Sequence, residues 1–104
     1  MPSFVRIAAV EDIPAEGVRA FEHASQRIAI YRLGDQIYAT SDICSHEYAE
    51  LSEGFLDVDD CTIECPLHGS RFDIRSGAVL SLPAFEPIAT FPVRVEGEDI
   101  LVEL

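Results

Sequence analysis

The sequence predicts an all-β domain, an antiparallel sandwich or barrel, with a small metal-binding subdomain inserted at residues 42–75. Three observations support this fold class. Short runs rich in Val, Ile, Phe and Tyr recur along the chain and are separated by Gly, Asp and Pro turns, which is typical of sandwiches and barrels. No stretch shows a helical period long enough for a core helix. Two Cys–His pairs interrupt the strand pattern near its middle.

The N-terminal part of the chain reads as a series of antiparallel strands. Gly34-Asp35 separates two apolar runs and predicts a tight hairpin. The segment 45–53 is too short for more than a turn or two of helix. The candidate strands in this part cover residues 4–10, 17–24, 27–33 and 36–40.

The C-terminal part begins with a short strand that leads into the second Cys–His pair. Pro83 and Pro87 exclude a central strand between them, because proline cannot donate to the sheet ladder. Ser76-Gly77 predicts the turn of a second hairpin, and Gly97 that of a third. The candidate strands here cover residues 61–65, 71–74, 78–80, 88–96 and 100–104.

The length and composition indicate one soluble domain, residues 1–104. The chain is long enough to bury a hydrophobic core, and 48% of its residues are apolar. Apolar runs are too short for a transmembrane helix, and the N-terminus lacks the pattern of a signal peptide. We therefore expect a cytoplasmic protein, in which clustered cysteines bind metal more often than they pair.

The chain is strongly acidic. It has seven Arg, no Lys and 19 acidic residues, which give a formal net charge of −12. Nucleic acids and anionic membranes are poor partners for such a surface, because both carry like charge. A protein partner with a basic docking patch is favoured, although acidity alone is equally consistent with a role in solubility.

Four residues with metal-ligating side chains are arranged as CxH and CxxH, with eighteen residues between the pairs. They are Cys44 and His46, then Cys65 and His68. Two thiolates and two imidazoles suit zinc or an iron–sulfur cluster and do not suit magnesium or calcium. A single zinc ion would draw all four ligands to one centre. A [2Fe–2S] cluster would divide them, with two thiolates on one iron and two imidazoles on the other.

The two motifs, CSH and CPLHGSRFD, resemble the cluster-binding boxes of the Rieske family. Nearly the full chain is similar to Rieske-type ferredoxins of bacterial aromatic ring-hydroxylating dioxygenase systems, including the Leu82-Pro83-Ala84 loop and the closing strands. The resemblance implies a Rieske-like β domain with one [2Fe–2S] cluster. Cys44 and Cys65 would bind the inner iron, and His46 and His68 the outer iron near the surface. Pro83 would lie in the loop that covers the cluster in this family.

Departures from the respiratory branch of this family are informative. That branch has an additional cysteine in each box, and the two form a disulfide; the matching positions here are Ala49 and Leu67. It also has a tyrosine where this chain has Phe72, while Ser70 keeps a hydroxyl. Fewer donors to sulfur predict a low reduction potential within the Rieske range. The third cysteine, Cys61, lies outside both boxes, and we interpret it as a buried free thiol.

The resemblance implies an electron carrier that is not itself an enzyme, because four protein ligands leave no coordination position for substrate. It would accept single electrons from an NAD(P)H-dependent flavoprotein reductase and pass them to the terminal oxygenase of an aromatic dioxygenase. We expect a monomer. Two alternatives stay open: a structural zinc-binding interaction module, and the Rieske-like small subunit of a nitrite reductase. Acidic residues near the expected tip are candidates for docking, namely Glu47, Glu50, Glu53, Asp57, Asp59 and Asp60.

Overall fold

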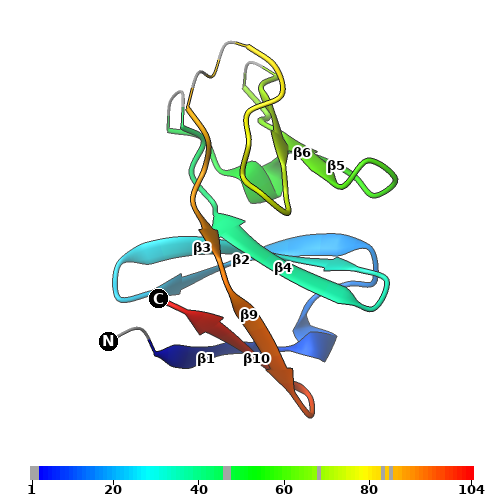
Figure 1. Cartoon of the computed structure of the whole chain (residues 1–104), viewed down its shortest axis with the longest axis vertical. Helices are drawn as coiled ribbons and strands as arrows, with labels where there is room; N and C mark the ends of the chain where they lie inside the picture. The colour runs from blue at the N-terminus through cyan, green and yellow to red at the C-terminus, as the bar shows by residue number, and fades with distance from the viewer. Residues whose placement is uncertain (1–2, 46–47, 68, 83, 85) are drawn as a thin grey trace.

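The computed structural model of the chain describes residues 3–45, 48–67, 69–82, 84 and 86–104. These residues form three antiparallel sheets and two short 3-10 helices, which confirms the predicted all-β class. The sheets are stacked along the longest axis of the molecule (Figure 1). None of the helices in the described ranges is long and apolar enough to cross a membrane.

The lower sheet brings the two ends of the chain together. Its strand order is β1-β10-β9, so the N-terminal strand pairs with the C-terminal one, with Val5 opposite Val102. The 3-10 helix η1 (Val10–Asp12) leads from this sheet to the next. The strands of the lower sheet are β1 (Phe4–Ala9), β9 (Val93–Glu96) and β10 (Asp99–Glu103).

The middle sheet contains the predicted N-terminal hairpins. Its order is β2-β3-β4-β8, and the Gly34-Asp35 turn joins β3 to β4 with Leu33 opposite Gln36, as predicted. The strands are β2 (Gly17–His23), β3 (Gln26–Leu33), β4 (Gln36–Ser41) and β8 (Thr90–Phe91).

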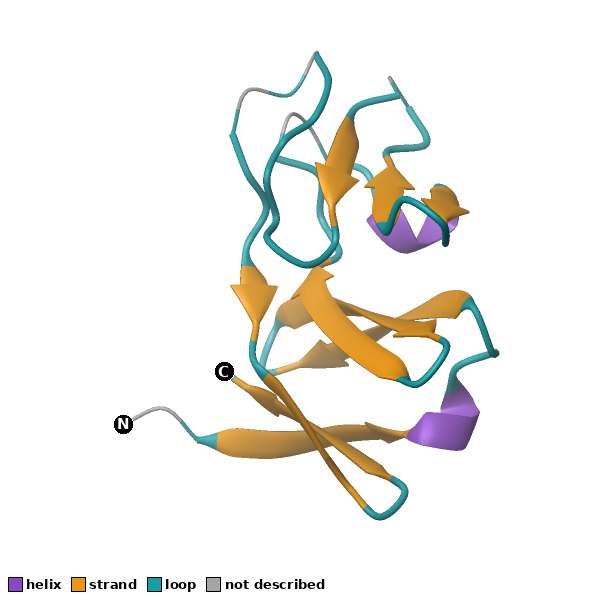
Figure 2. Ribbon diagram, turned by 45° about the vertical axis from the view of Figure 1, so that its right-hand side comes forward, coloured by secondary structure: helices purple, strands orange, loops and turns teal. Residues whose placement is uncertain are grey.

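The upper sheet is small and lies beside the loops that contain the two Cys–His boxes (Figures 1 and 2). Its order is β5-β6-β7, and the 3-10 helix η2 (Leu51–Glu53) precedes it. Its strands are β5 (Phe55–Asp57), β6 (Thr62–Glu64) and β7 (Arg71–Asp73). Residues 76–82, which follow β7, also run through this upper part of the molecule.

Strand β3 separates two hydrophobic cores. Successive side chains of a strand point to opposite faces, so Ile28 and Ile30 pack into the lower core, while Ala29 and Tyr31 pack into the upper core. All four residues are fully buried. The upper core therefore rests directly on the middle sheet, and it includes both box cysteines, Cys44 and Cys65.

The structure differs from the predicted elements in three places. Residues 78–80 form no strand and pair with β7 only through a bridge between Val79 and Phe72. The predicted strand 88–96 is divided into β8 and β9, because Pro92 has no N–H to continue the ladder. Strand β5 was not predicted; its three residues follow Gly54 and show too little alternation to be read as a strand.

Candidate metal centre

Each box begins with a buried cysteine in a loop that a backbone hydrogen bond closes five residues later. The Cys44 N–H donates to the carbonyl of Ala49 at 2.9 Å, and the Cys65 N–H donates to that of Ser70 at 2.7 Å. Cys44 is 4% exposed and Cys65 is 2% exposed. Two separate segments therefore bring their thiol groups into one apolar core by similar local folding.

The positions of the predicted histidine ligands lie within these two loops. His46 and His68 are themselves outside the described residues, so the four-residue ligand set stays a prediction. Within the described ranges, no group of three or more His, Cys, Asp or Glu side chains is placed to hold a metal ion.

A buried carboxylate fixes the first box to the middle sheet. Asp42 is fully buried, accepts the Ser52 N–H at 2.8 Å, and lies 3.5 Å from Nη2 of Arg27 on β3. The same guanidinium nitrogen lies 2.8 Å from a Glu50 carboxylate oxygen. Sequence reasoning missed Asp42, although its place two residues before Cys44 is a usable signal. Glu50, expected at the docking tip, is instead paired with Arg27.

Three of the four residues compared with the respiratory branch are buried, and Leu67 is exposed. Ala49 is buried beside the cysteines, and Leu67 is 57% exposed. Phe72 is fully buried and has no hydroxyl to donate. Ser70 is fully buried, and its Oγ accepts the Ala84 N–H at 3.0 Å, which leaves the hydroxyl proton available to another acceptor.

Cys61 differs from its sequence interpretation. It is half-buried, not fully buried, and lies in the turn before β6 with a φ of 58°. Burial raises the pKa of the Cys61 thiol; Arg75 lowers this pKa and Asp73 raises it, and the net result is a pKa above the ordinary value. The thiol is therefore a poor nucleophile near neutral pH.

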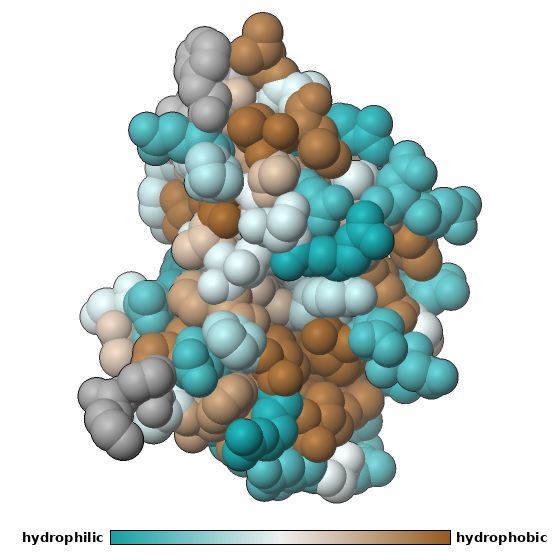
Figure 3. Space-filling model, in the orientation of Figure 1, coloured by the Kyte–Doolittle hydropathy of each residue, from teal (hydrophilic) through white to brown (hydrophobic). Residues whose placement is uncertain are grey.

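Apolar side chains are exposed around the boxes. Tyr48, which follows the first box, is 73% exposed, and Leu82, in the loop after β7, is 68% exposed. Together with Leu67 they belong to the upper part of the molecule, where Figure 3 shows apolar side chains near the top. We call Tyr48, Leu67 and Leu82 the apolar rim.

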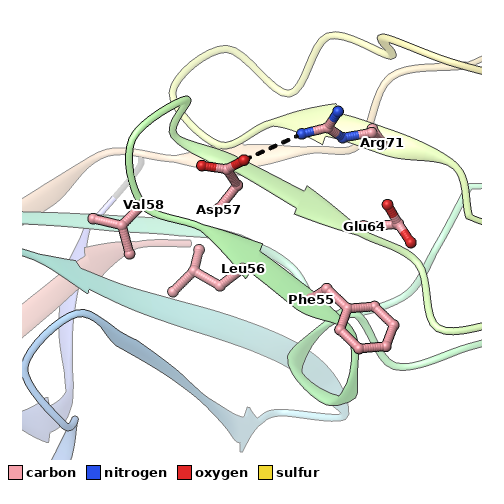
Figure 4. Close-up of a pocket in the computed structure, with 6 residues that line it drawn as sticks. All are labelled: Phe55, Leu56, Asp57, Val58, Glu64 and Arg71. Carbon is pink, nitrogen blue, oxygen red and sulfur yellow. Dashed lines mark ion pairs between the residues drawn. The ribbon is translucent and has the colours of Figure 1, made fainter.

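A hollow of about 310 Å³ lies on the outer face of the upper sheet (Figure 4). Arg71 lines it and lies 3.6 Å from Asp57 and 4.0 Å from Asp60. Phe55 and Glu64 lie together on the right of this view, away from Val58. The turn that carries Asp59 and Asp60 joins β5 to β6 at the end of β6 away from Cys65, so these acidic residues are farther from the boxes than we expected.

The donor chemistry fits an iron–sulfur cluster. Buried thiols at the starts of two closed loops can supply soft thiolate ligands in a site shielded from water. The sequence has a histidine two residues after Cys44 and another three residues after Cys65; with these imidazoles, each loop would offer one ligand of each kind.

Comparisons with known proteins agree with this arrangement. Residues 3–92 match the family model of the Rieske [2Fe–2S] domain. The chain is 46% identical over 95 residues to the 3-phenylpropionate/cinnamic acid dioxygenase ferredoxin subunits of Shigella boydii and Escherichia coli K12, covering 91% of this chain and 88% of each relative.

Solved structures show the same fold. The ferredoxin of carbazole 1,9a-dioxygenase from Nocardioides aromaticivorans superposes with a TM-score of 0.91 at 38% identity and 96% coverage of both chains. The Sphingomonas yanoikuyae ferredoxin superposes with a TM-score of 0.90 at 29% identity, and the match covers 98% of this chain and 99% of that one. A putative nitrite reductase small subunit gives 0.82 at 19% identity, a likeness of fold alone. The predicted Rieske-type [2Fe–2S] cofactor is confirmed at the level of the family, and the chain belongs to the Rieske [2Fe–2S] family.

Proposed function

We propose that this chain is the ferredoxin of an aromatic ring-hydroxylating dioxygenase system, and that Cys44, His46, Cys65 and His68 hold its [2Fe–2S] cluster. It carries single electrons from an NAD(P)H-dependent flavoprotein reductase to a terminal oxygenase. The observation that supports this best is the burial of Cys44 and Cys65 in one core, at the starts of two similarly closed loops. The relatives with 46% identity are ferredoxin subunits of a dioxygenase.

The protein part of this function is to hold the cluster rigidly and bring it close to a partner. When bound, the cluster accepts and releases one electron. The upper core shields the two cysteines from water, while the His46 and His68 positions lie further along the same loops. The Asp42–Arg27 contact connects the start of the first loop to β3.

Electron paramagnetic resonance of the dithionite-reduced protein, together with iron and acid-labile sulfide analysis, tests the ligand set. We expect two irons and two sulfides per chain and the low average g value of a mixed Cys/His cluster. His46→Cys and His68→Cys should each lose that low g value. Zinc without acid-labile sulfide in the purified protein would exclude the proposal and favour a structural zinc module.

We also propose that the apolar rim contacts the redox partner. A carbazole dioxygenase ferredoxin with 38% identity has been solved in complex with its oxygenase. Large apolar side chains that stay exposed in a small protein commonly mark an interaction surface. Tyr48 and Leu67 are exposed beside the two boxes, and Leu82 is exposed in the loop that is hydrogen-bonded to both.

The rim is tested with Tyr48→Ser and Leu82→Ser in a reductase-to-oxygenase electron-transfer assay. Each variant should raise the ferredoxin concentration needed for half-maximal rate about tenfold, since each removes one buried apolar contact in the complex. Val95→Ser is the matched control, because Val95 is 45% exposed but lies on β9 in the lower sheet. Equal effects of all three substitutions would exclude the rim as the docking surface.

The neighbouring genes distinguish a dioxygenase system from a nitrite reductase. An adjacent terminal oxygenase and flavoprotein reductase would support the proposal, and an adjacent nitrite reductase large subunit would contradict it. We further propose that residues 1–104 act as one monomeric, cytoplasmic Rieske domain. Size-exclusion chromatography and cell fractionation test these two properties.

A further inference from the structure

The loop between β7 and β8 is bonded to both boxes through serine hydroxyl groups. On the side of the first box, Ser45 Oγ donates to the carbonyl oxygen of Glu86 at 2.6 Å. On the side of the second box, the Ala84 N–H donates to Ser70 Oγ at 3.0 Å. We call residues 81–87 the third loop, of which residues 81, 82, 84, 86 and 87 are described.

A third serine fixes the beginning of the same loop. Ser81 Oγ accepts the Arg71 N–H at 3.0 Å and lies 3.5 Å from the carbonyl oxygen of Gly69, to which it donates. Gly69 and Arg71 flank Ser70, so Ser81 is bonded to the segment that closes the second box. The start, middle and end of the third loop are therefore each anchored by one serine.

The third loop also contributes to the core that contains the box cysteines. Ala84 is 1% exposed and packs in the upper core with Cys44 and Cys65. If the loop moved outward, Ala84 would leave this core and water could enter beside both cysteines. The bond from the Ala84 N–H to Ser70 is therefore placed to hold Ala84 in the core beside the two cysteines.

This connection matters because the two boxes have no cysteine besides Cys44 and Cys65, so no additional pair is present to form a disulfide between them. The positions where the respiratory branch has its additional cysteines are Ala49 and Leu67, neither of which carries sulfur. Ser45 of the first box and Ser70 of the second box are instead bonded to the third loop, and Ser81 of that loop is bonded to the second box.

We propose that Ser45, Ser70 and Ser81 form a hydroxyl latch that ties the two boxes together through the third loop and keeps water from the cluster. They are positioning residues for the electron carrier, and the inference rests on the cluster site proposed above. Ser45 and Ser81 give the clearest test, because the buried Ser70 hydroxyl is also free to donate to the cluster.

The experiment measures how fast a ferrous-iron chelator bleaches the visible absorbance of the reduced, cluster-containing protein. Ser45→Ala and Ser81→Ala should each accelerate bleaching about fivefold to tenfold, because each loses a hydrogen bond that holds the loop closed. Ser76→Ala is the matched control: the Ser76 hydroxyl accepts the Ala78 N–H in an exposed turn outside the third loop. Its bleaching rate should stay within about twofold of the wild type.

A second measurement, the reduction potential, separates positioning from general stability. Opening the loop admits water, which stabilises the additional negative charge of the reduced state, so the potential of Ser45→Ala and Ser81→Ala should rise. Ser45→Thr keeps the hydroxyl and should restore both the potential and the bleaching rate to the wild-type values.

Three outcomes would overturn the latch. Bleaching of Ser45→Ala and Ser81→Ala at the Ser76→Ala rate is one, and an unchanged potential in both variants is another. The third outcome applies if Ser45→Ala purifies without a cluster. If Ser45→Thr is then also colourless, the loss does not depend on the hydroxyl group, which contradicts the latch. A wild type without acid-labile sulfide would instead contradict the cluster site, a result distinct from these three.

Discussion

Ser70 and Phe72 stand two residues apart, and only one of them carries a hydroxyl group. Both side chains are fully buried, Phe72 in the upper core with Cys65 and Ser70 at the end of the loop whose backbone bond closes on Cys65. Hydrogen bonds to sulfur stabilise the reduced, more negative state and raise the potential. The buried Phe72 ring cannot donate such a bond, whereas the Ser70 hydroxyl can.

At this residue scale we expect a midpoint potential in the lower part of the Rieske range of about −150 to +300 mV. Ser70→Ala should lower it further and Phe72→Tyr should raise it, because the first change removes a donor and the second adds one. Redox titration followed by visible spectroscopy measures all three proteins. A wild-type midpoint above about +150 mV would contradict the argument.

The Cys61 thiol gives a prediction about pH. Because burial raises its pKa, the thiol stays protonated and slow to alkylate at pH 7–8. The unfolded chain, with the lower pKa, loses this proton first as the pH rises, so Cys61 makes folding less favourable above the ordinary thiol pKa.

Two charged neighbours of Cys61 act on this thiol pKa in opposite directions: Asp73 raises it and Arg75 lowers it. Asp73→Asn should therefore speed iodoacetamide labelling, and Arg75→Gln should slow it, as followed by mass spectrometry. Changes in the same direction would exclude this electrostatic account.

Two hairpin turns of the middle sheet contain residues with left-handed backbone conformations. Residues Ala24 and Ser25 join β2 to β3 with positive φ angles of 51° and 70°, which side chains other than glycine adopt at a cost. Gly34, in the turn between β3 and β4, has a φ of 62°, and a methyl group added there would have no neighbour within 4 Å. The two turns therefore differ in how well their residues suit the backbone.

Opposite substitutions in these turns should have opposite effects. Ala24→Gly should raise the free energy of unfolding by about 1 kcal/mol, and Gly34→Ala should lower it by a similar amount, since each exchanges alanine and glycine at a positive φ. Urea unfolding followed by far-ultraviolet circular dichroism measures both. A gain from Gly34→Ala would contradict the assignment of strain to the left-handed backbone.

Gly77 connects the turn after β7 to Ile88, the residue that follows the third loop. It has a φ of 79°, and its carbonyl accepts the Ile88 N–H at 2.9 Å. A Cβ at this position would collide with the carbonyl oxygen of Ile88, while Gly97, with a φ of 63°, has open space around it.

Gly77→Ala should therefore lower the free energy of unfolding more than Gly97→Ala does. The Gly97 change carries only the backbone cost of about 1 kcal/mol, whereas the Gly77 change adds a collision that pushes the third loop outward. We expect a lower iron content per chain in purified Gly77→Ala and a normal content in Gly97→Ala. Equal iron content in both proteins would show that the third loop tolerates this displacement.

Much of the element order could be predicted because it depends on local patterns. Alternation along residues 27–33 and the Gly34-Asp35 turn are local, and both appear as predicted in β3 and its hairpin. Strand β5 could not be predicted, since three residues are too few to show a period. The bond from Ser45 to Glu86 joins residues 41 positions apart, and no local signal indicates such a contact. The expectation that Asp59 and Asp60 lie close to the boxes was wrong for the same reason. The direction of β6 places their turn at the end of the strand away from Cys65.

At the scale of the whole molecule, charge and apolar surface are separated. The chain has a formal charge of −12, but three of the acidic residues proposed for docking lie within 4 Å of the chain's own arginines. The apolar rim lies at the boxes, while the exposed Asp59 lies on the turn between β5 and β6. This arrangement suits long-range attraction by net charge followed by short-range apolar contact.

Measurements of electron transfer to a basic partner at different ionic strengths should distinguish the effect of net charge from the effect of apolar contact. The bimolecular rate constant should fall as salt rises from about 20 to 200 mM, because the Debye length shortens to about 8 Å near physiological salt. Asp59→Asn combined with Asp60→Asn should reduce this salt dependence, since two negative charges are removed. Leu82→Ser should lower the rate at every salt concentration and leave the dependence unchanged, because the substitution alters no charge. Stopped-flow absorbance measures all three proteins, and a rate independent of salt in the wild type would show that net charge does not guide the encounter.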